Sequence, residues 1–278
     1  MVNIVCVKVG TKYKANDVNR LYRMIDLNMS IPYNFYCFTD DEEGLLLPIK
    51  KKRVYDLPLH SYWWKMTVFD KTMWDNNEPT LYLDLDVIIQ NDITYLFERV
   101  NRELIRIGYI GTEPKMQEYE ASVGIKHYAD VNSSIMLYHA QDMHLIYEIF
   151  MLEPEINITE YFGMCRYLTH KHGYDMTHFK YWNDWYSAWK AYPAGQKIKD
   201  SPWQTMQTSE CEVDIMMYPD SAICIMNPPY WITENQELEV LEKVFSFYYG
   251  WLLKRSETAV FSSARPQQFH GGIHRPAA

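Results

Sequence analysis

The chain has 278 residues, of which 15% are aromatic, and a formal net charge of −9. This length allows one large α/β domain, alone or with an appended element. The negative charge argues against nucleic acid or an anionic membrane surface as the main partner. The aromatic content fits a hydrophobic core, and it also fits stacking surfaces for sugars or bases.

The first elements alternate between strand and helix patterns. Residues 3–9 alternate and are rich in β-branched residues, which predicts a strand, and a turn at Gly10 follows. Apolar residues recur at helical spacing from about Asp17, and Asn16 or Asp17 would cap this helix. A second strand is predicted at 34–38. This order predicts a parallel arrangement with helices on the faces of the sheet, and a ligand crevice at the carboxyl ends of the strands.

The later segments continue the α/β pattern. A helix is predicted at 61–74 with Ser61 as its cap, and Asp142 would cap another helix that Pro154 ends. Further strands are predicted at 80–83, 107–111, 131–138 and 222–226, and a further helix at 237–249.

The compartment can be inferred from apolar runs and cysteines. No stretch approaches about 18 consecutive apolar residues, and no basic region followed by a long apolar one opens the chain, so neither a transmembrane helix nor a signal peptide is expected. The five cysteines show no C-x-x-C pair and no zinc spacing. We therefore expect a reducing compartment, the cytoplasm, or the host cytoplasm for a viral protein.

Asp84 and Asp86 are the most informative residues, because they end the apolar run 80–83. Side chains two apart on a strand share one face, about 7 Å apart at their Cα atoms, and two such carboxylates repel each other unless a cation neutralises them. Hard oxygen ligands suit magnesium, manganese or calcium, and substrate phosphates commonly fill the positions left open. The pattern predicts a metal-assisted site for a phosphorylated ligand. The alternative is a solvated turn, because such triplets also arise by chance.

Five short segments occur in an order that resembles the GT-A glycosyltransferases, with a pattern similar to family-8-like enzymes and small viral or bacterial nucleotide-sugar transferases. The segments are residues 7–13, 38–41, 62–65, 81–86 and 131–134. The resemblance implies an α/β, Rossmann-like GT-A domain with a mixed central sheet and helices on both faces.

The resemblance also implies roles for individual residues. Asp84 and Asp86 would bind Mn²⁺ or Mg²⁺, which holds the diphosphate of a sugar nucleotide and neutralises charge on the leaving group. Lys65 would reach the phosphates or the sugar. The other substrate-binding residues would be Gly10, Thr11 and Tyr13 around the nucleotide, Asp40 at the same sheet edge, and Asn132 and Ser133 near the donor sugar or acceptor.

Three of these residues have plainer alternatives that the sequence leaves open. Tyr13 could pack behind the first helix, Lys65 could be a solvated lysine, and Asn132 could be a turn residue at the start of its strand.

The chain departs from the family-8-like pattern at two places. No Gly-Asp-Gln type triplet follows the strand at 131–138, and the acidic candidates there are Glu160, Asp175 and Asp184. The late strand ends in Asn227, where these enzymes place a histidine ligand. His270 lies in a tail segment similar to the family's His-Gly segment, so either the tail supplies a third metal ligand or the site lacks its histidine.

The sequence therefore predicts one GT-A domain over residues 1–255 and a polar tail at 256–278. The domain would transfer a sugar from a nucleotide-sugar donor to a hydroxyl acceptor on a glycan, glycoprotein or lipid-linked precursor. Asp130 and Asp184 are candidates for a catalytic base, and both inverting and retaining chemistry stay open. The alternatives are a nucleotidyltransferase, disfavoured by the single glycine after the first strand, and a non-catalytic glycan- or nucleotide-binding protein on a decayed transferase fold.

Overall fold

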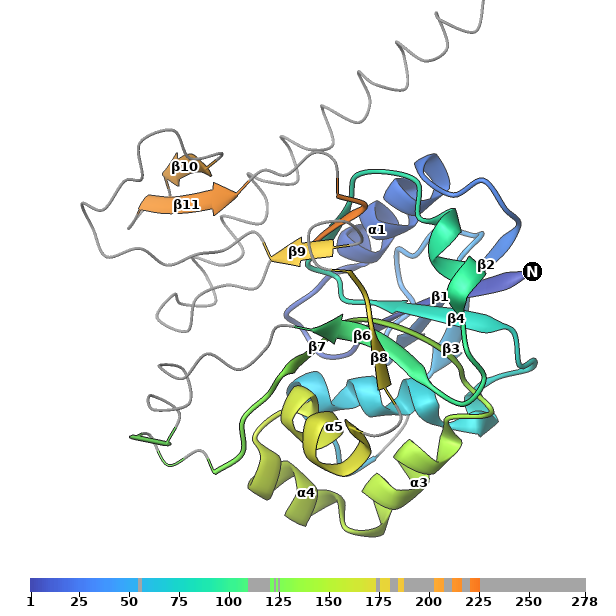
Figure 1. The fold of residues 1–278 in the computed structure, drawn as a ribbon. Helices are drawn as coiled ribbons and strands as arrows, with labels where there is room; N and C mark the ends of the chain where they lie inside the picture. Colours follow the sequence, from blue (N-terminus) through green and yellow to red (C-terminus); the bar gives the residue numbers. More distant parts are fainter. Residues whose placement is uncertain are drawn as a thin grey trace, which may run out of the picture.

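The structure, a computed structural model, describes residues 1–54, 57–109, 121–122, 124, 126–173, 176–180, 185–187, 203–207, 212–216 and 221–225. In this part of the chain the main sheet has seven strands in the order β3-β2-β1-β4-β7-β6-β8 (Figure 1). Their bounds are β1 (Val2–Lys8), β2 (Tyr33–Thr39), β3 (Lys50–Arg53), β4 (Pro79–Leu83), β6 (Ile105–Tyr109), β7 (Val131–His139) and β8 (Met176–His178).

The main sheet is mixed, as predicted. β1 pairs in parallel with β2 and β4, and β2 pairs in parallel with β3. β7 runs antiparallel to both β4 and β6, while β8 is parallel to β6. The carboxyl ends of β1, β2 and β4 therefore lie at one edge of the sheet, the edge at which loops of such sheets build a ligand crevice.

Shorter strands form two further sheets. β5 (Val87–Ile89) pairs antiparallel with β12 (Ile223–Ile225), and β12 pairs in parallel with β9 (Trp185–Ser187). β10 (Trp203–Gln207) and β11 (Glu212–Met216) form an antiparallel pair. The β5–β12 pairing bears on the site, because β5 begins directly after Asp86.

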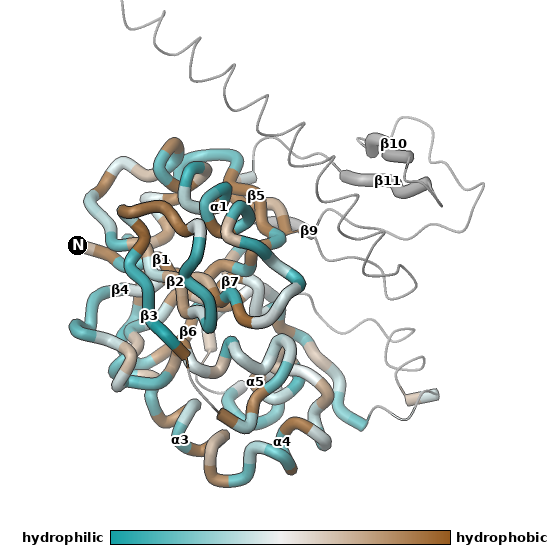
Figure 2. Tube along the Cα trace, turned by 180° about the vertical axis from the view of Figure 1, so that it is seen from behind, coloured by the Kyte–Doolittle hydropathy of each residue, from teal (hydrophilic) through white to brown (hydrophobic). Residues whose placement is uncertain are grey.

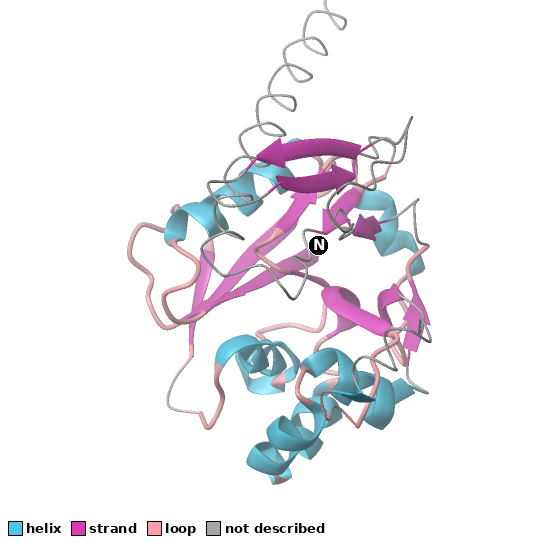
Figure 3. Ribbon diagram, turned by 90° about the vertical axis from the view of Figure 1, so that its left-hand side faces the viewer, coloured by secondary structure: helices cyan, strands magenta, loops and turns pink. Residues whose placement is uncertain are grey.

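Helices cover both faces of the main sheet (Figures 1 and 3). On one face α1 (Ala15–Leu27) and η3 (Thr94–Arg99) contribute to a buried apolar cluster. On the other face a second cluster joins η1 (Ser61–Phe69), α3 (His144–Leu152), α4 (Pro154–Tyr161) and α5 (Met164–His172).

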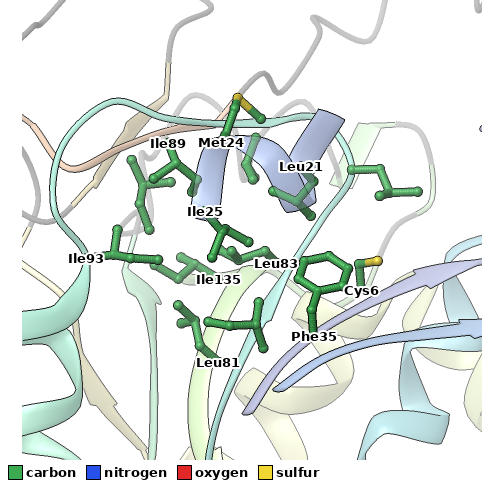
Figure 4. Close-up of a cluster of buried hydrophobic side chains, with 14 of the residues drawn as sticks. Cys6, Leu21, Met24, Ile25, Phe35, Leu81, Leu83, Ile89, Ile93 and Ile135 are labelled. Carbon is green, nitrogen blue, oxygen red and sulfur yellow. The ribbon is translucent and has the colours of Figure 1, made fainter. Parts of the chain in front are cut away.

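Alternating side chains of the strands supply both clusters. Cys6 joins the cluster under α1, whereas Val5 joins the cluster under η1, and Leu81 and Tyr82 divide in the same way. Because Asp84 lies two residues after Tyr82, the alternation directs it to the η1 face. Figure 4 shows the α1 side of this packing, with Leu21, Met24 and Ile25 near Leu81, Leu83 and Ile135.

The outermost strand of the sheet, next to β2, is strongly hydrophilic (Figure 2). It is β3, with the sequence Lys-Lys-Lys-Arg, and none of its residues is buried. Charged edge strands resist pairing with another chain, so this basic run has a structural reason to be there.

The segment at 61–74 differs from the predicted α-helix. It forms two 3₁₀ helices, η1 and η2 (Lys71–Met73). His60 precedes η1, and Ser61 takes a left-handed φ of 51°, so Ser61 is not the cap that the sequence predicted. The aromatic and β-branched residues of η1 have weak α-helix propensity, although nine residues is long for a 3₁₀ helix.

Two other predicted caps were also wrong. Lys14 precedes α1, and Asp17 instead accepts a hydrogen bond from the Lys14 backbone N–H at 2.8 Å. Met143 precedes α3 in place of Asp142. Pro154 does mark the end of α3, because it is the first residue of α4, where a missing N–H costs nothing.

Among the described residues, no helix is both long and apolar enough to cross a membrane. The predicted helix at 237–249 and the predicted tail at 256–278 lie outside the described residues. The domain boundary at residue 255 therefore stays a prediction.

Candidate functional site

Asp84 and Asp86 lie at the carboxyl end of β4, between β4 and β5. The Asp84 backbone N–H donates to the Ser134 carbonyl of β7 at 3.0 Å, which fixes the end of the strand. Leu85, between the two acids, is buried in the cluster under α1. Asp86 is itself buried, with 9% of its surface exposed. The triplet is therefore a largely buried turn between two strands and is not a solvated one.

Asp84 receives two strong hydrogen-bond donors. The Lys65 Nζ contacts Asp84 Oδ2 at 2.5 Å, and the Tyr82 hydroxyl donates to Asp84 Oδ1. The lysine and aspartate side chains are only 16% and 14% exposed. Charge-assisted bonds of this kind are about twice as strong as neutral ones, so Asp84 is held in one orientation.

The electrostatics of Lys65 and Tyr82 follow from this contact. Burial lowers the pKa of Lys65, but electrostatic interactions with Asp84, Cys165 and Asp86, together with the hydrogen bond to Asp84, raise it more. The net pKa of Lys65 lies above its ordinary value, so the ammonium stays charged. Burial and the Asp84 charge also raise the pKa of Tyr82 well above its ordinary value, which keeps the hydroxyl protonated as a donor.

The position of Lys65 is set by the packing of η1. Trp63 is almost fully buried and stacks on Phe150 of α3, with ring centroids 5.2 Å apart. Met66 is fully buried in the same cluster. These anchors direct Lys65 toward Asp84, so the solvated alternative for Lys65 was wrong.

Ser133 of β7 contacts Cys165 in the first turn of α5. Its backbone N–H and hydroxyl lie 3.3 Å and 3.2 Å from the Cys165 sulfur. Cys165 was not among the predicted site residues, and its interaction with Lys65 helps to raise the pKa of that lysine. Its only signal in sequence was a cysteine outside the apolar runs, and nothing local connects residue 165 to residue 133.

Asn132 is engaged with its own strand. Its side-chain oxygen accepts a hydrogen bond from the Ser134 N–H at 2.8 Å. The pairing of β6 with β7 is irregular here, because Gly108 pairs with Asn132 although Ile107 pairs with Met136. Asn132 therefore lies within β7 at an irregularity of the strand pairing and not in a turn, and its contact with a substrate stays a prediction.

Gly10 and Asp40 meet at the ends of β1 and β2. The Gly10 N–H donates to Asp40 Oδ2 at 3.0 Å. Gly10 has a φ of +79°, a conformation that glycine adopts without strain. The expectation that these two loops share one edge of the sheet is confirmed. Thr11 is exposed in the same loop.

Tyr13 and Lys8 complete this end of the site. Tyr13 is partly buried and packs against the cluster under α1, as its alternative reading expected. Lys8, which the sequence analysis missed, is only 4% exposed. Its Nζ donates to the Asp41 carbonyl at 3.3 Å and lies 3.8 Å from the Asp41 carboxylate. A lysine inside the apolar alternation of the first strand was its signal in sequence.

Of the candidates for a catalytic base or third ligand, Asp130 can be placed. Its Oδ1 accepts a hydrogen bond from the Thr169 hydroxyl of α5 at 2.9 Å. Glu160 is exposed and lies 3.2 Å from His127. The other candidates, Asp175, Asp184, Asn227 and His270, lie outside the described residues.

Comparison with known proteins identifies the fold. No protein-family model matches the sequence, and no curated protein sequence matches it. The galactosyltransferase LgtC in complex with donor and acceptor sugar analogues aligns with a TM-score of 0.53 and 13% identity, over 97% of this chain and 99% of that chain. An active-site mutant of LgtC aligns with a TM-score of 0.54 and 12% identity, over 90% and 95%. The chain has the GT-A fold.

The GT-A fold confirms the predicted fold class, and the likeness to family 8 in particular stays a prediction. On this fold, Gly10 and Asp40 lie together at one edge of the sheet and Lys65 meets Asp84, as described above.

The residues around Asp84 and Asp86 fit a divalent cation. Both supply hard carboxylate oxygens, and Asp84, Asp86 and the Lys65 side chain all lie in a largely buried place. Within the described residues no group of three or more His, Cys, Asp or Glu side chains could hold a metal ion. From this part of the chain, a cation would therefore have two carboxylates, and its remaining positions would be open to phosphate or water.

Proposed function

We propose that this protein transfers a sugar from a nucleotide-sugar donor to a hydroxyl acceptor, with Mn²⁺ or Mg²⁺ bound at Asp84 and Asp86. The observation that carries the proposal is the contact of Lys65 with Asp84, two residues before the buried Asp86, at the carboxyl end of β4 in a GT-A sheet. The LgtC neighbour, which was solved with donor and acceptor sugar analogues, supports a sugar donor and a sugar acceptor for this chain.

The residues of this edge have separate roles in the proposed reaction. Gly10 lets the backbone come close to the nucleotide, and Lys65 supplies a positive charge for the phosphates. A bound divalent cation would neutralise the charge that develops on the departing nucleoside diphosphate. Tyr82 holds the Asp84 carboxylate in place through its hydroxyl. Asp130, together with Asp184, remains the proposed base for the acceptor hydroxyl.

The test is release of nucleoside diphosphate from a panel of nucleotide sugars, with and without Mn²⁺, and with chelator. We expect Mn²⁺-dependent release from at least one donor, and its loss in Asp86→Asn. Asp75→Asn is a matched control, because Asp75 pairs with Lys52 at 3.0 Å but its side chain is 75% exposed. Its activity should equal that of the wild type.

One observation favours the non-catalytic alternative, because Asp84 is engaged by Lys65 and Tyr82 and the described residues offer no third metal ligand. Under that alternative the panel would show binding of a nucleoside diphosphate by calorimetry without consumption of any donor. Consumption of a nucleoside triphosphate with release of pyrophosphate would favour the nucleotidyltransferase alternative.

A further inference from the structure

The Lys65 ammonium lies against the Asp84 carboxylate, which is also a proposed ligand of the divalent cation. Its ammonium contacts Oδ2 of that carboxylate at 2.5 Å, while the Tyr82 hydroxyl takes Oδ1. An ammonium and a divalent cation seek the same negative charge. The contact therefore creates a competition between a residue of the chain and the metal that the two carboxylates fit.

The surroundings of Lys65 allow its ammonium to move while η1 stays fixed. Trp63 and Met66 bury their side chains on either side of it, so the backbone of η1 is anchored. The lysine stem has four flexible carbons and carries a compact charge with three rotatable donors. The ammonium also lies 5.8 Å from the centre of the Tyr82 ring, a polarisable surface that tolerates a shift of the charge.

We propose that Lys65 is the resident counter-cation of Asp84, and that a divalent cation displaces it and thereby frees its ammonium for the phosphates of the donor. This inference rests on the proposed function, because it concerns the order in which the same site takes up its ligands. The cation must break the ion pair when it binds alone. When a diphosphate is also present, the released ammonium gains a new partner, so the two ligands bind cooperatively.

The first experiment measures Mn²⁺ binding by calorimetry, with Mn²⁺ as the only ligand. Lys65→Met removes the competitor and keeps the length of the side chain, so we expect Mn²⁺ to bind at least about tenfold more tightly than to the wild type. The matched control is Lys71→Met, since Lys71 pairs with Glu148 at 2.8 Å on the exposed surface. This control should bind Mn²⁺ as the wild type does.

Repeating the titration with saturating UDP tests the second half of the proposal. The wild type should gain affinity for Mn²⁺ when UDP is present, and Lys65→Met should gain much less, because it has no ammonium to release. Equal or weaker Mn²⁺ binding by Lys65→Met without UDP would overturn the exchange. Absence of Mn²⁺ binding in every variant would overturn it as well.

A second measurement uses the wild-type chain and so does not depend on the folding of a variant. Acylation of lysines by an amine reagent, read by mass spectrometry, should be faster at Lys65 when Mn²⁺ is present alone and slower when UDP is added. Lys71 is the internal reference and should not change. Unchanged acylation of Lys65 at saturating Mn²⁺ would contradict displacement.

These outcomes separate the exchange from the proposed function. Metal-dependent consumption of a nucleotide sugar without displacement of Lys65 would leave the transferase proposal standing and remove the exchange. Displacement of Lys65 without consumption of any nucleotide sugar would leave the exchange standing and remove the transferase proposal.

Discussion

Two lysines reach the same edge of the sheet, and their partners differ in burial. Lys8 of β1 is the more buried lysine, yet its partner Asp41 has a side chain that is 63% exposed. Lys65 of η1 pairs with Asp84, which is only 14% exposed. An exposed carboxylate stays solvated when its lysine is removed, whereas a buried one is left without compensation. The burial of the acid therefore decides how much each ion pair contributes to the free energy of unfolding.

The largest effect is expected at Asp84. Asp84→Asn should lower transfer by more than about a hundredfold, because it removes a proposed metal ligand. It should also lower the free energy of unfolding by roughly 1–3 kcal/mol, because Lys65 loses its charged hydrogen-bond partner. Donor turnover in Mn²⁺ measures the first effect, and urea melts in chelator measure the second. A variant with wild-type turnover and stability would mean that the Asp84 pair is no more important than the Asp41 pair.

The two lysines can be compared directly with the same substitution. Lys65→Met should lower the free energy of unfolding by about 1–2 kcal/mol, because Asp84 is left buried beside Asp86. Lys8→Met should change it by less than about 0.5 kcal/mol, because Asp41 remains in water and a buried charge is replaced by an apolar chain. Urea melts in chelator are the measurement. Equal losses would refute the rule that the burial of the acid decides.

Gly10 follows β1, which carries Lys8, and its substitution tests how much its left-handed backbone conformation contributes to stability. Gly10→Ala should cost about 1 kcal/mol, because a Cβ at positive φ is strained although it would meet nothing within 4 Å. Gly44→Ala should cost more, since its φ is +76° and its Cβ would also lie 3.1 Å from the Ala15 Cβ. Thermal melts of both variants rank the two effects. A smaller loss for Gly44→Ala would contradict this account.

The smallest effect is a pH dependence that belongs to Lys65. Its pKa in the folded state lies above the ordinary 10.5, mainly because Asp84 outweighs the effect of burial. The ion pair therefore stabilises the fold fully below the pKa of the unfolded chain, and this contribution is lost as pH rises through the folded pKa. Urea melts at about pH 9 and about pH 11 should show a steeper loss for the wild type than for Lys65→Met. Parallel losses would place Lys65 outside a stabilising pair.

Much of the frame could be predicted from sequence, because its signals are local. The alternation in β1 and β4 and the helical spacing in α1 depend on neighbours along the chain. Gly10 and Asp40 could be placed together because parallel strands end at one edge. The 3₁₀ form of η1 was missed, since the pattern of buried residues resembles that of an α-helix.

The chemistry of the site was less accessible from sequence, because its contacts join distant residues. From repulsion between Asp84 and Asp86 alone, neutralising one of them is expected to leave the free energy of unfolding unchanged or to raise it. Because Asp84 also pairs with Lys65, neutralising Asp84 is expected to lower the free energy of unfolding instead. No local sequence pattern indicates this contact. Cys165 meets Ser133 only because α5 packs on β7, a consequence of tertiary packing.

The pairing of β5 with β12 has a consequence for the synthesis of the protein. Ile89 lies opposite Ile223, so the strand that follows Asp86 acquires this partner only after well over a hundred further residues have been added. While the chain is still on the ribosome, β5 has an apolar edge that β12 has not yet covered, and such edges invite wrong pairing. The sheet that follows Asp86 is therefore completed late in synthesis, whereas the Asp84 contacts with Lys65, Tyr82 and Ser134 need only residues made earlier.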